Sequence, residues 1–170
     1  MLDVYGRDQI LGFLKALDKE LDEPFELILI GGTAATLAYK VTRATRDIDA
    51  INNVKGLQKA YEATKQKTGV DIPLEQVSVF DSPYDYEDRL VILEDSSLTN
   101  LVIKIPEIHD LILMKTIRGY EHDFEAIQEM IEKNEVSKST LEERIRNELG
   151  QAIGNKKRIG LNFSALLELF

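Results

Sequence analysis

Residues 28–51 read ILIGGTAATLAYKVTRATRDIDAI, and this stretch decides the fold. With the residues just before it, its start forms an apolar run over 25–30 that predicts a buried strand. Gly31 and Gly32 end that strand, and a helix is expected over 33–40. Glycines at the mouth of a helix let backbone N–H groups approach a ligand closely, and the helix N-terminus favours an anion. The glycines therefore predict a phosphate-binding turn, and the alternative is a plain tight turn that needs positive φ.

The second half of the stretch presents two carboxylates. A strand expected over 47–51 carries Asp47 and Asp49 on one face and Ile48 on the other, because side chains alternate along a strand. Two oxygen ligands with this spacing suit Mg²⁺, which in proteins also takes oxygens from a nucleotide's phosphates. A solvated strand face is the alternative interpretation. Combined with the glycine turn, the two acids indicate phosphoryl or nucleotidyl transfer.

The remaining hydrophobic pattern alternates helices and strands before it becomes purely helical. Helices are expected over 7–21, 55–67, 107–118, 123–132, 139–149 and 161–169, and further strands over 76–80, 89–93 and 98–105. This order predicts an α/β (α+β) fold, with a small mixed sheet flanked by helices and a helical C-terminal part. We expect one domain over 1–135 and a C-terminal helical extension over 136–170 that packs on it.

The composition excludes several classes of protein. The 170 residues include no cysteine, so no disulfide framework and no thiolate metal site can form. Since the sequence has neither a secretory signal nor an apolar run near the ~18 residues of a membrane span, we expect a cytoplasmic protein without a membrane partner. Thirty acidic against twenty-one basic residues give a net charge of −9, which argues against an extended nucleic-acid-binding surface.

The central motif carries a resemblance to a known superfamily. The glycine pair, the short helix and the run Arg43-Ala44-Thr45-Arg46-Asp47-Ile48-Asp49 resemble the signature of the nucleotidyltransferases related to DNA polymerase β. The chain is similar to the minimal bacterial members that resemble abortive-infection toxins of the type IV toxin–antitoxin class. Lys115, Arg118 and Asp123 follow in the order of those proteins' basic and acidic positions, so that the resemblance covers about residues 27–132.

This resemblance implies the nucleotidyltransferase fold and a role for each matching residue. The nucleotide's phosphates would be held by Gly31, Gly32 and Thr33, and the outgoing pyrophosphate would meet Arg43 and Arg46. Two divalent ions (Mg²⁺ or Mn²⁺) would be bound by Asp47 and Asp49. Lys115 would contact a phosphate or the base, and Asp123 would order the site. Two alternatives stay open for the later residues. Lys115 can extend outward to solvent, and Asp123 can be an ordinary first-turn acid or a partner of Arg118.

A third metal-binding carboxylate is usual in active members of this superfamily, but no acid lies within an obvious strand face. Asp81, just after the strand expected over 76–80, is our first choice. Glu75 and Asp71 rank behind it.

The expected activity is metal-dependent transfer of a nucleoside monophosphate from an NTP to an acceptor hydroxyl. The acceptor would be RNA, such as a tRNA 3′ end, or a protein, and the acidic composition favours a protein or a short contact at an RNA end. By resemblance, the setting would be a toxin–antitoxin or phage-defence pair, with a cognate antitoxin or toxin as partner. The alternative is a catalytically weak member of the fold that serves as a binding or antitoxin module.

Overall fold

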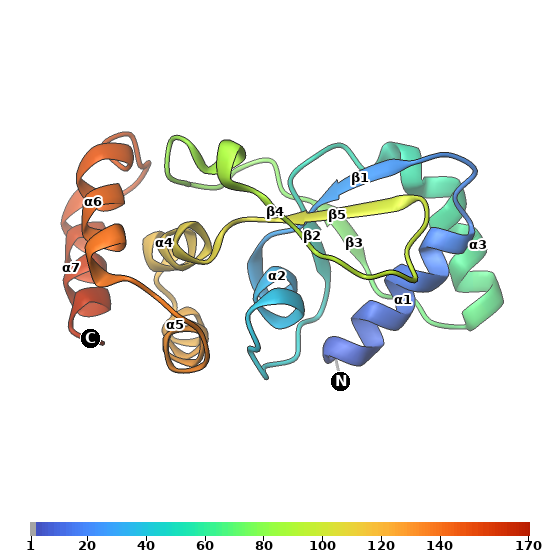
Figure 1. The fold of residues 1–170 in the computed structure, drawn as a ribbon, viewed down its shortest axis with the longest axis horizontal. Coiled ribbons are helices and arrows are strands. Elements are labelled where there is room, and N and C mark those ends of the chain that lie inside the picture. Colours follow the sequence, from blue (N-terminus) through green and yellow to red (C-terminus); the bar gives the residue numbers. More distant parts are fainter. Residues whose placement is uncertain (1–2) are drawn as a thin grey trace. The chain divides into compact units, whose positions relative to one another are not determined.

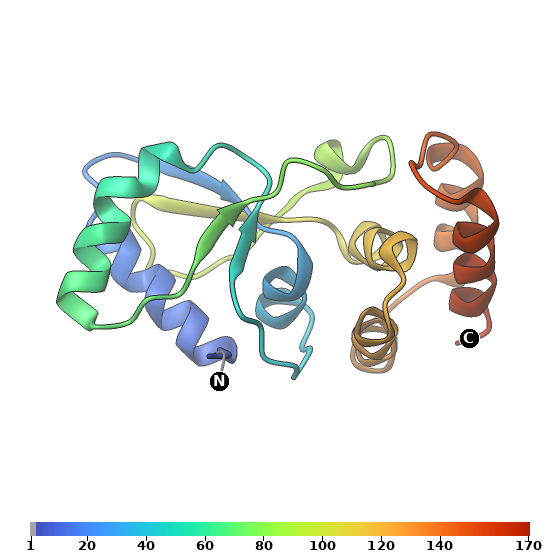
Figure 2. The same ribbon diagram turned by 180° about the vertical axis from the view of Figure 1, so that it is seen from behind.

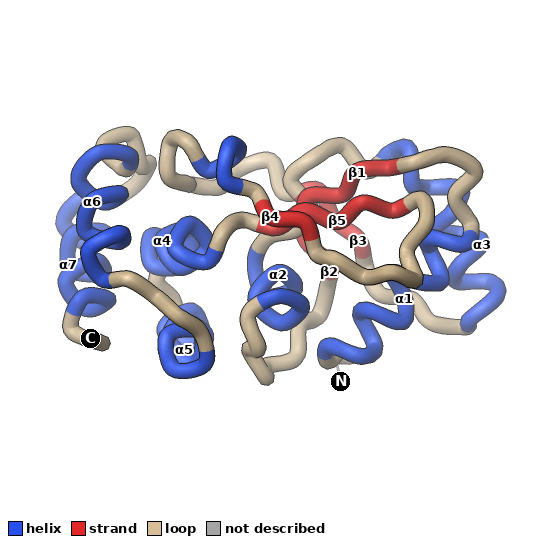
Figure 3. Tube along the Cα trace, viewed as in Figure 1, coloured by secondary structure: helices blue, strands red, loops and turns tan. Residues whose placement is uncertain are grey.

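The computed structural model describes residues 3–170, and its elements follow the predicted order of helices and strands. The helices are α1 (Arg7–Lys19), α2 (Gly31–Ala38), α3 (Gln58–Thr68), α4 (Ile108–Arg118), α5 (Glu121–Lys133), α6 (Lys138–Glu148) and α7 (Lys156–Leu167). The strands are β1 (Phe25–Ile28), β2 (Ile48–Ala50), β3 (Leu74–Gln76), β4 (Val91–Ile92) and β5 (Leu101–Ile105) (Figure 1, Figure 3). The 3-10 turns η1 (Lys55–Leu57) and η2 (Tyr86–Arg89) complete them.

The described chain divides into two compact units, each of which is considered by itself. The first comprises the residues up to Ala38, Thr42–Ser78 and Val91–Ile105. The second comprises Tyr39–Val41, Val79–Leu90 and Pro106–Phe170. The first unit therefore contains every strand, and the second contains α4 to α7.

The first unit is built on a small mixed sheet. β5 lies between β1, to which it is parallel, and β4, to which it is antiparallel. β2 and β3 form a parallel pair in which Asp49 lies opposite Glu75. An antiparallel bridge between Leu29 and Ala50 connects the two sets of strands. The sheet thus places β2 and β3 beside the end of β1, where the glycine turn begins (Figure 2).

The core of the first unit lies between this sheet and the helices α1 and α3. Helix α1 packs against α3 and α2, and its apolar stripe is buried at Ile10, Leu14 and Leu17. Asp18 in the same helix is also buried, and its carboxylate accepts hydrogen bonds from the backbone N–H groups of residues 99–101 at the start of β5. Burial alone raises the pKa of Asp18, but these hydrogen bonds outweigh it and lower the pKa.

The second unit is a helical assembly centred on α4. Helix α4 packs against α5, α6 and α7, and its residues Leu111, Ile112 and Leu113 are fully buried, as expected from its nearly continuous apolar sequence. Met130 of α5 and Leu141 of α6 are buried in the same unit. The predicted domain boundary between 135 and 136 falls inside this unit, which begins before α4.

Several predicted element boundaries are wrong in detail, among them those of β3 and α7. The strand expected over 76–80 is instead β3, Leu74–Gln76, because its pairing with β2 ends where Val77 N donates to Ala50 O. Val79, beyond that bond, is 83% exposed. Helix α7 begins at Lys156 rather than 161, because the Asn155 side chain caps it by accepting a hydrogen bond from Arg158 N.

The predicted fold class is confirmed: the chain has a mixed α/β fold with a small sheet and a helical C-terminal part. Within residues 3–170 no helix has the length and apolar character needed to cross a membrane.

Candidate functional site

Three carboxylates converge in the first unit on one face of the β2–β3 pair. Asp47 precedes β2 by one residue, Asp49 lies within β2, and Glu75 is the register partner of Asp49 in β3. One carboxylate oxygen from each of the three lies within 4.8 Å of the others. Asp47 and Asp49 are half-buried and Glu75 is exposed. We call these three residues the carboxylate triad.

Threonine hydroxyls hold the backbone of Asp47. The Oγ1 of Thr33, at the start of α2, donates to Asp47 O at 2.9 Å, and the Oγ1 of Thr45 donates to the same oxygen at 3.2 Å. Thr33 is 1% exposed, so this hydroxyl is committed to Asp47. The role predicted for Thr33 thus acquires a structural component, because its side chain positions a triad residue.

The glycine turn lies directly against Asp49. Ile30 N donates to Asp49 O at 3.0 Å, which ties the end of β1 to β2. Gly31 has φ +67, and a Cβ built there would lie 3.1 Å from Asp49 Oδ2. A side chain at this position would therefore be strained and would press on the carboxylate. Positive φ is present, as the plain-turn interpretation requires, and the close approach to a functional candidate is present as well.

The first turn of α2, which includes Gly32, provides backbone N–H groups beside the glycine turn and Asp49. These N–H groups have no partner within the helix ladder, because the first turn of any helix leaves its donors open. A Cβ at Gly32 would lie 3.3 Å from Thr45 Oγ1. The segment that follows α2 carries Arg43 and Arg46, both exposed. Carboxylates, helix N-terminus and arginines are therefore contributed by residues 31–49 and by Glu75.

The third carboxylate of the group is Glu75 and not our first choice, Asp81. Asp81 belongs to the second unit, where its Oδ1 accepts a hydrogen bond from Ile153 N at 2.9 Å. Glu75 ranks lower in the sequence because the strand predicted there starts only at residue 76. The parallel pairing of β2 with Leu74–Gln76 places Glu75 opposite Asp49. No local sequence pattern predicts this pairing.

Lys115 and Asp123 lie together in the second unit. Asp123 is fully buried and accepts hydrogen bonds from Arg118 Nε at 2.8 Å and from Tyr120 N at 3.2 Å. Lys115 is 4% exposed, and its Nζ lies 3.6 Å from Asp123 Oδ1, so it does not extend to solvent. Burial raises the pKa of Asp123, but Arg118 and Lys115 outweigh burial and lower it.

The chemistry of the triad fits a divalent cation. Three like charges at this separation repel one another, and a cation among them relieves that repulsion. The donors are all carboxylate oxygens, which Mg²⁺ and Mn²⁺ prefer, and the exposure of Glu75 leaves room for ligands from a substrate. The residues present can therefore hold the predicted metal.

The comparison with protein families gives a match over nearly the whole chain. A family model, DUF6036, described as a nucleotidyltransferase of unknown function, matches residues 9–165. No curated protein and no solved structure matches the chain. The matched range includes the glycine turn, the carboxylate triad and both buried residues Lys115 and Asp123.

Proposed function

The chain belongs to the DUF6036 family of nucleotidyltransferases, and from that premise we propose that it transfers a nucleoside monophosphate from an NTP to an acceptor hydroxyl. The observation that carries the proposal is the convergence of Asp47, Asp49 and Glu75 beside the glycine turn. An NTP brings a chain of phosphates that needs both a cation and backbone donors. The first unit offers ligands for both within one site.

The triad and the N-terminus of α2 have different roles in the reaction: the first binds the metal ion and the second binds phosphate. A divalent ion, when bound, neutralises phosphate charge and lowers the pKa of the acceptor hydroxyl. Asp47 and Asp49 hold it, with Asp47 positioned by Thr33 and Thr45. The open N–H groups of Gly31, Gly32 and Thr33 bind phosphate oxygens, and the exposed Arg43 and Arg46 attract the outgoing pyrophosphate.

The transfer is written so that its atoms balance. The acceptor oxygen forms a bond to the α-phosphorus of the NTP while the bond from that phosphorus to the β-phosphate oxygen breaks. Pyrophosphate leaves with the electron pair of the broken bond. The hydroxyl proton passes to the carboxylate of Glu75, the most exposed member of the triad, and from there to water.

For the second unit we propose the roles that the resemblance implies. Asp123 orders Arg118 and Lys115, as its hydrogen bonds and the 3.6 Å separation from Lys115 Nζ support. Lys115 contacts a phosphate or the base. Lys115 is nearly buried, and Asp123 provides the acidic partner that a buried lysine requires.

A transfer assay tests the proposal. The purified chain is incubated with each α-labelled NTP, MgCl₂ or MnCl₂, and either total RNA or cell extract, and the product is treated with ribonuclease or protease to identify the acceptor. We expect label on one acceptor class. No transfer with every NTP, together with no nucleotide binding by calorimetry, contradicts the proposal. Transfer that survives the double variant Asp47→Ala, Asp49→Ala contradicts the metal assignment.

The toxin–antitoxin setting, with a cytoplasmic target, is a further part of the proposal. Its test is growth of a bacterial culture after induced expression of the chain and of the double variant Asp47→Ala, Asp49→Ala. A toxin stops growth in an activity-dependent way, whereas an antitoxin or binding module does not. The alternative is a catalytically weak member that serves as a binding or antitoxin module, and the position of Glu75 beside Asp47 and Asp49 supports the active form over it.

A further inference from the structure

Strand β3 has an open outer edge. Among the described residues it pairs with β2 alone. Ile48 N donates to Pro73 O and Val77 N donates to Ala50 O, so the odd-numbered residues of this segment direct their backbone groups toward β2. Because such groups alternate in a parallel ladder, Leu74 and Gln76 direct theirs outward. No backbone hydrogen bond within residues 3–170 uses them, so two N–H and two C=O groups are available to another strand.

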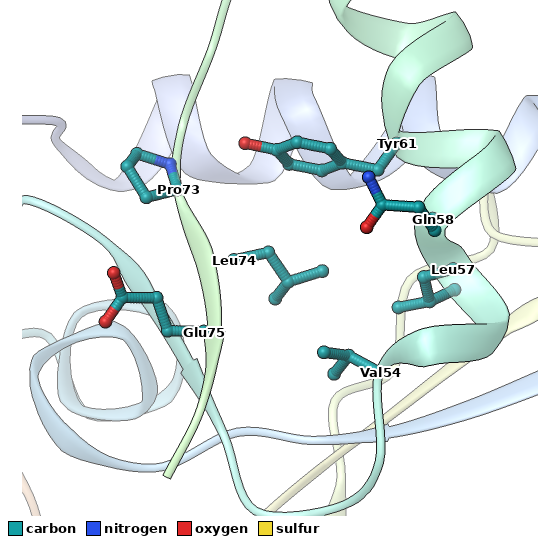
Figure 4. Close-up of a pocket in the computed structure, with 7 residues that line it drawn as sticks. All are labelled: Val54, Leu57, Gln58, Tyr61, Pro73, Leu74 and Glu75. Atoms are coloured by element: carbon teal, nitrogen blue, oxygen red, sulfur yellow. The ribbon is translucent and has the colours of Figure 1, made fainter.

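A pocket adjoins this edge on one face of β3. It has a volume of about 200 Å³ and lies between β3 and the η1–α3 segment. Its lining combines apolar and polar side chains and contains no cation: Val54, Leu57, Gln58, Tyr61, Pro73, Leu74 and Glu75. Figure 4 shows Leu74 pointing toward Val54 and Leu57, whereas the Glu75 side chain points to the other side of β3. Glu75 is therefore shared by the pocket lining and the triad, and its carboxylate points to the side of β3 opposite Leu74.

A polypeptide strand added to β3 would reach both faces at once. Successive side chains of a strand point to opposite faces of a sheet, so neighbouring residues of the added strand would lie one over the pocket and one on the triad's face. Such strand addition obtains affinity from backbone hydrogen bonds and selectivity from pockets for alternate side chains. The open groups of Leu74 and Gln76 provide the first, and the pocket provides the second.

Charge complementarity selects a polypeptide over a nucleic acid at this edge. The chain has a net charge of −9, which opposes the binding of an RNA strand that carries a phosphate at every nucleotide. A polypeptide carries the amide donors and acceptors that pair with Leu74 and Gln76. It can also carry lysine or arginine, which the net negative charge of the chain attracts.

We infer that the outer edge of β3 binds the acceptor as an extended basic polypeptide segment, with one apolar side chain in the pocket and an adjacent hydroxyl side chain beside the triad. This inference rests on the proposed nucleotidyl transfer and names its acceptor. The hydroxyl oxygen of that serine, threonine or tyrosine forms the new bond to the α-phosphorus. Pyrophosphate leaves and the hydroxyl proton passes to Glu75, as in the reaction written above.

Two synthetic peptides of equal composition test the geometry on the full chain. In the first, a leucine stands between a threonine and a serine, with two lysines at each end. In the second, leucine, serine and threonine occupy every second position, so that the hydroxyls share the face of the leucine. Binding is measured without nucleotide by fluorescence anisotropy, and transfer is measured with the labelled NTPs. We expect the first peptide to bind and to be labelled, and the second to remain unlabelled.

Two variants locate the binding. Val54→Asp places a charge in the pocket, and Gln76→Pro removes an outward N–H without a loss of pairing to β2. Each is expected to weaken binding of the first peptide by about tenfold or more, because a buried charge or a lost strand hydrogen bond is costly. Val70→Asp, which puts the same charge on an exposed valine outside the pocket, leaves binding unchanged.

The outcomes separate this inference from the proposed function. If the first peptide binds in the expected variant-dependent way but is never labelled, the strand site stands and the proposed transfer to it fails. If RNA is labelled while neither peptide binds, nucleotidyl transfer stands and the inference is overturned. Equal labelling of the two peptides, or binding that is indifferent to both Val54→Asp and Gln76→Pro, also overturns it.

Discussion

The two units treat their acidic side chains in opposite ways. In the second unit, Asp110 is fully buried, and its carboxylate accepts hydrogen bonds from Arg89 Nε at 2.8 Å and from Arg144 Nη1 at 2.8 Å. Glu107 binds Arg144, and Glu148 accepts from Arg89 Nη2 at 2.6 Å. In the first unit, Asp47, Asp49 and Glu75 converge on one another. The first set of acids is paired with guanidinium groups of the same unit, and the second set brings three carboxylates close to one another.

This difference indicates what each set is for. A carboxylate that accepts several hydrogen bonds from partly buried arginines stabilises the packing of helices and has few acceptor positions left for a ligand. Carboxylates that converge at a partly exposed sheet face carry a repulsion that a bound cation would relieve. The acidic residues of the chain therefore have two different structural roles, and the number of acids in the sequence does not distinguish them.

The largest expected effect is the loss of stability when an acid that binds arginines is removed. Asp110→Ala leaves Arg89 and Arg144 without their shared buried partner and is expected to lower the free energy of unfolding by about 3–5 kcal/mol. Glu75→Ala, in the triad, is expected to cost less than about 1 kcal/mol, because Glu75 is an exposed side chain. Urea unfolding of both variants measures the contrast. Equal losses would show that the two sets do not differ in structural role.

The pH dependence of stability provides the next contrast. Burial raises the pKa of Glu107, but its hydrogen bonds with His109 and Arg144 outweigh burial and bring the pKa to about 2. The folded pKa lies below the unfolded value, so the stabilisation is complete above about pH 4.5 and is lost as pH falls toward 2. It amounts to about 3 kcal/mol. Glu107→Gln should flatten the pH profile of unfolding between pH 5 and pH 2, and an unchanged profile would refute the assignment.

Metal binding should stabilise the molecule through the triad alone. At a free Mn²⁺ concentration of about 100 times the dissociation constant, the free energy of unfolding is expected to rise by about 2.7 kcal/mol. The triple variant Asp47→Asn, Asp49→Asn, Glu75→Gln should lose this gain, whereas Glu62→Gln, which alters an exposed acid of α3, should keep it. Thermal unfolding with and without MnCl₂ measures it. A gain that persists in the triple variant would place the metal elsewhere.

The smallest expected effect concerns the glycine turn. Gly31→Ala and Gly69→Ala both place a side chain at positive φ, and each should cost about 1 kcal/mol for that reason. Gly31→Ala adds a contact at 3.1 Å with Asp49 Oδ2, whereas nothing lies within 4 Å of a Cβ at Gly69. Only Gly31→Ala is therefore expected to weaken Mn²⁺ binding, as measured by calorimetry. Equal Mn²⁺ affinity in the two variants would show that the glycine turn does not affect metal binding by the triad.

Local patterns predicted most of the elements and part of the site. Apolar residues at helical spacing identified α1 and α4, and the alternation of Asp47, Ile48 and Asp49 was enough to place both acids on one face. The pattern failed at β3, where only Leu74 is both apolar and partly buried, so that no alternation marks the strand. Its position depends on pairing with β2, which lies more than twenty residues earlier in the chain.

The sequence by itself determined the fold class, the glycine turn and the two aspartates, because each depends on residues within a few positions of one another. The tertiary structure decided which third acid joins them and which acids are neutralised. Glu75 meets Asp49 through a parallel strand pair, and Asp110 meets Arg89 and Arg144 through the packing of α4 and α6 with η2. The carboxylates of Asp and Glu and the guanidinium of Arg have the same chemistry at every position in a sequence. Long-range packing alone decides which carboxylates meet arginines in the second unit and which carboxylates converge at the β2–β3 pair.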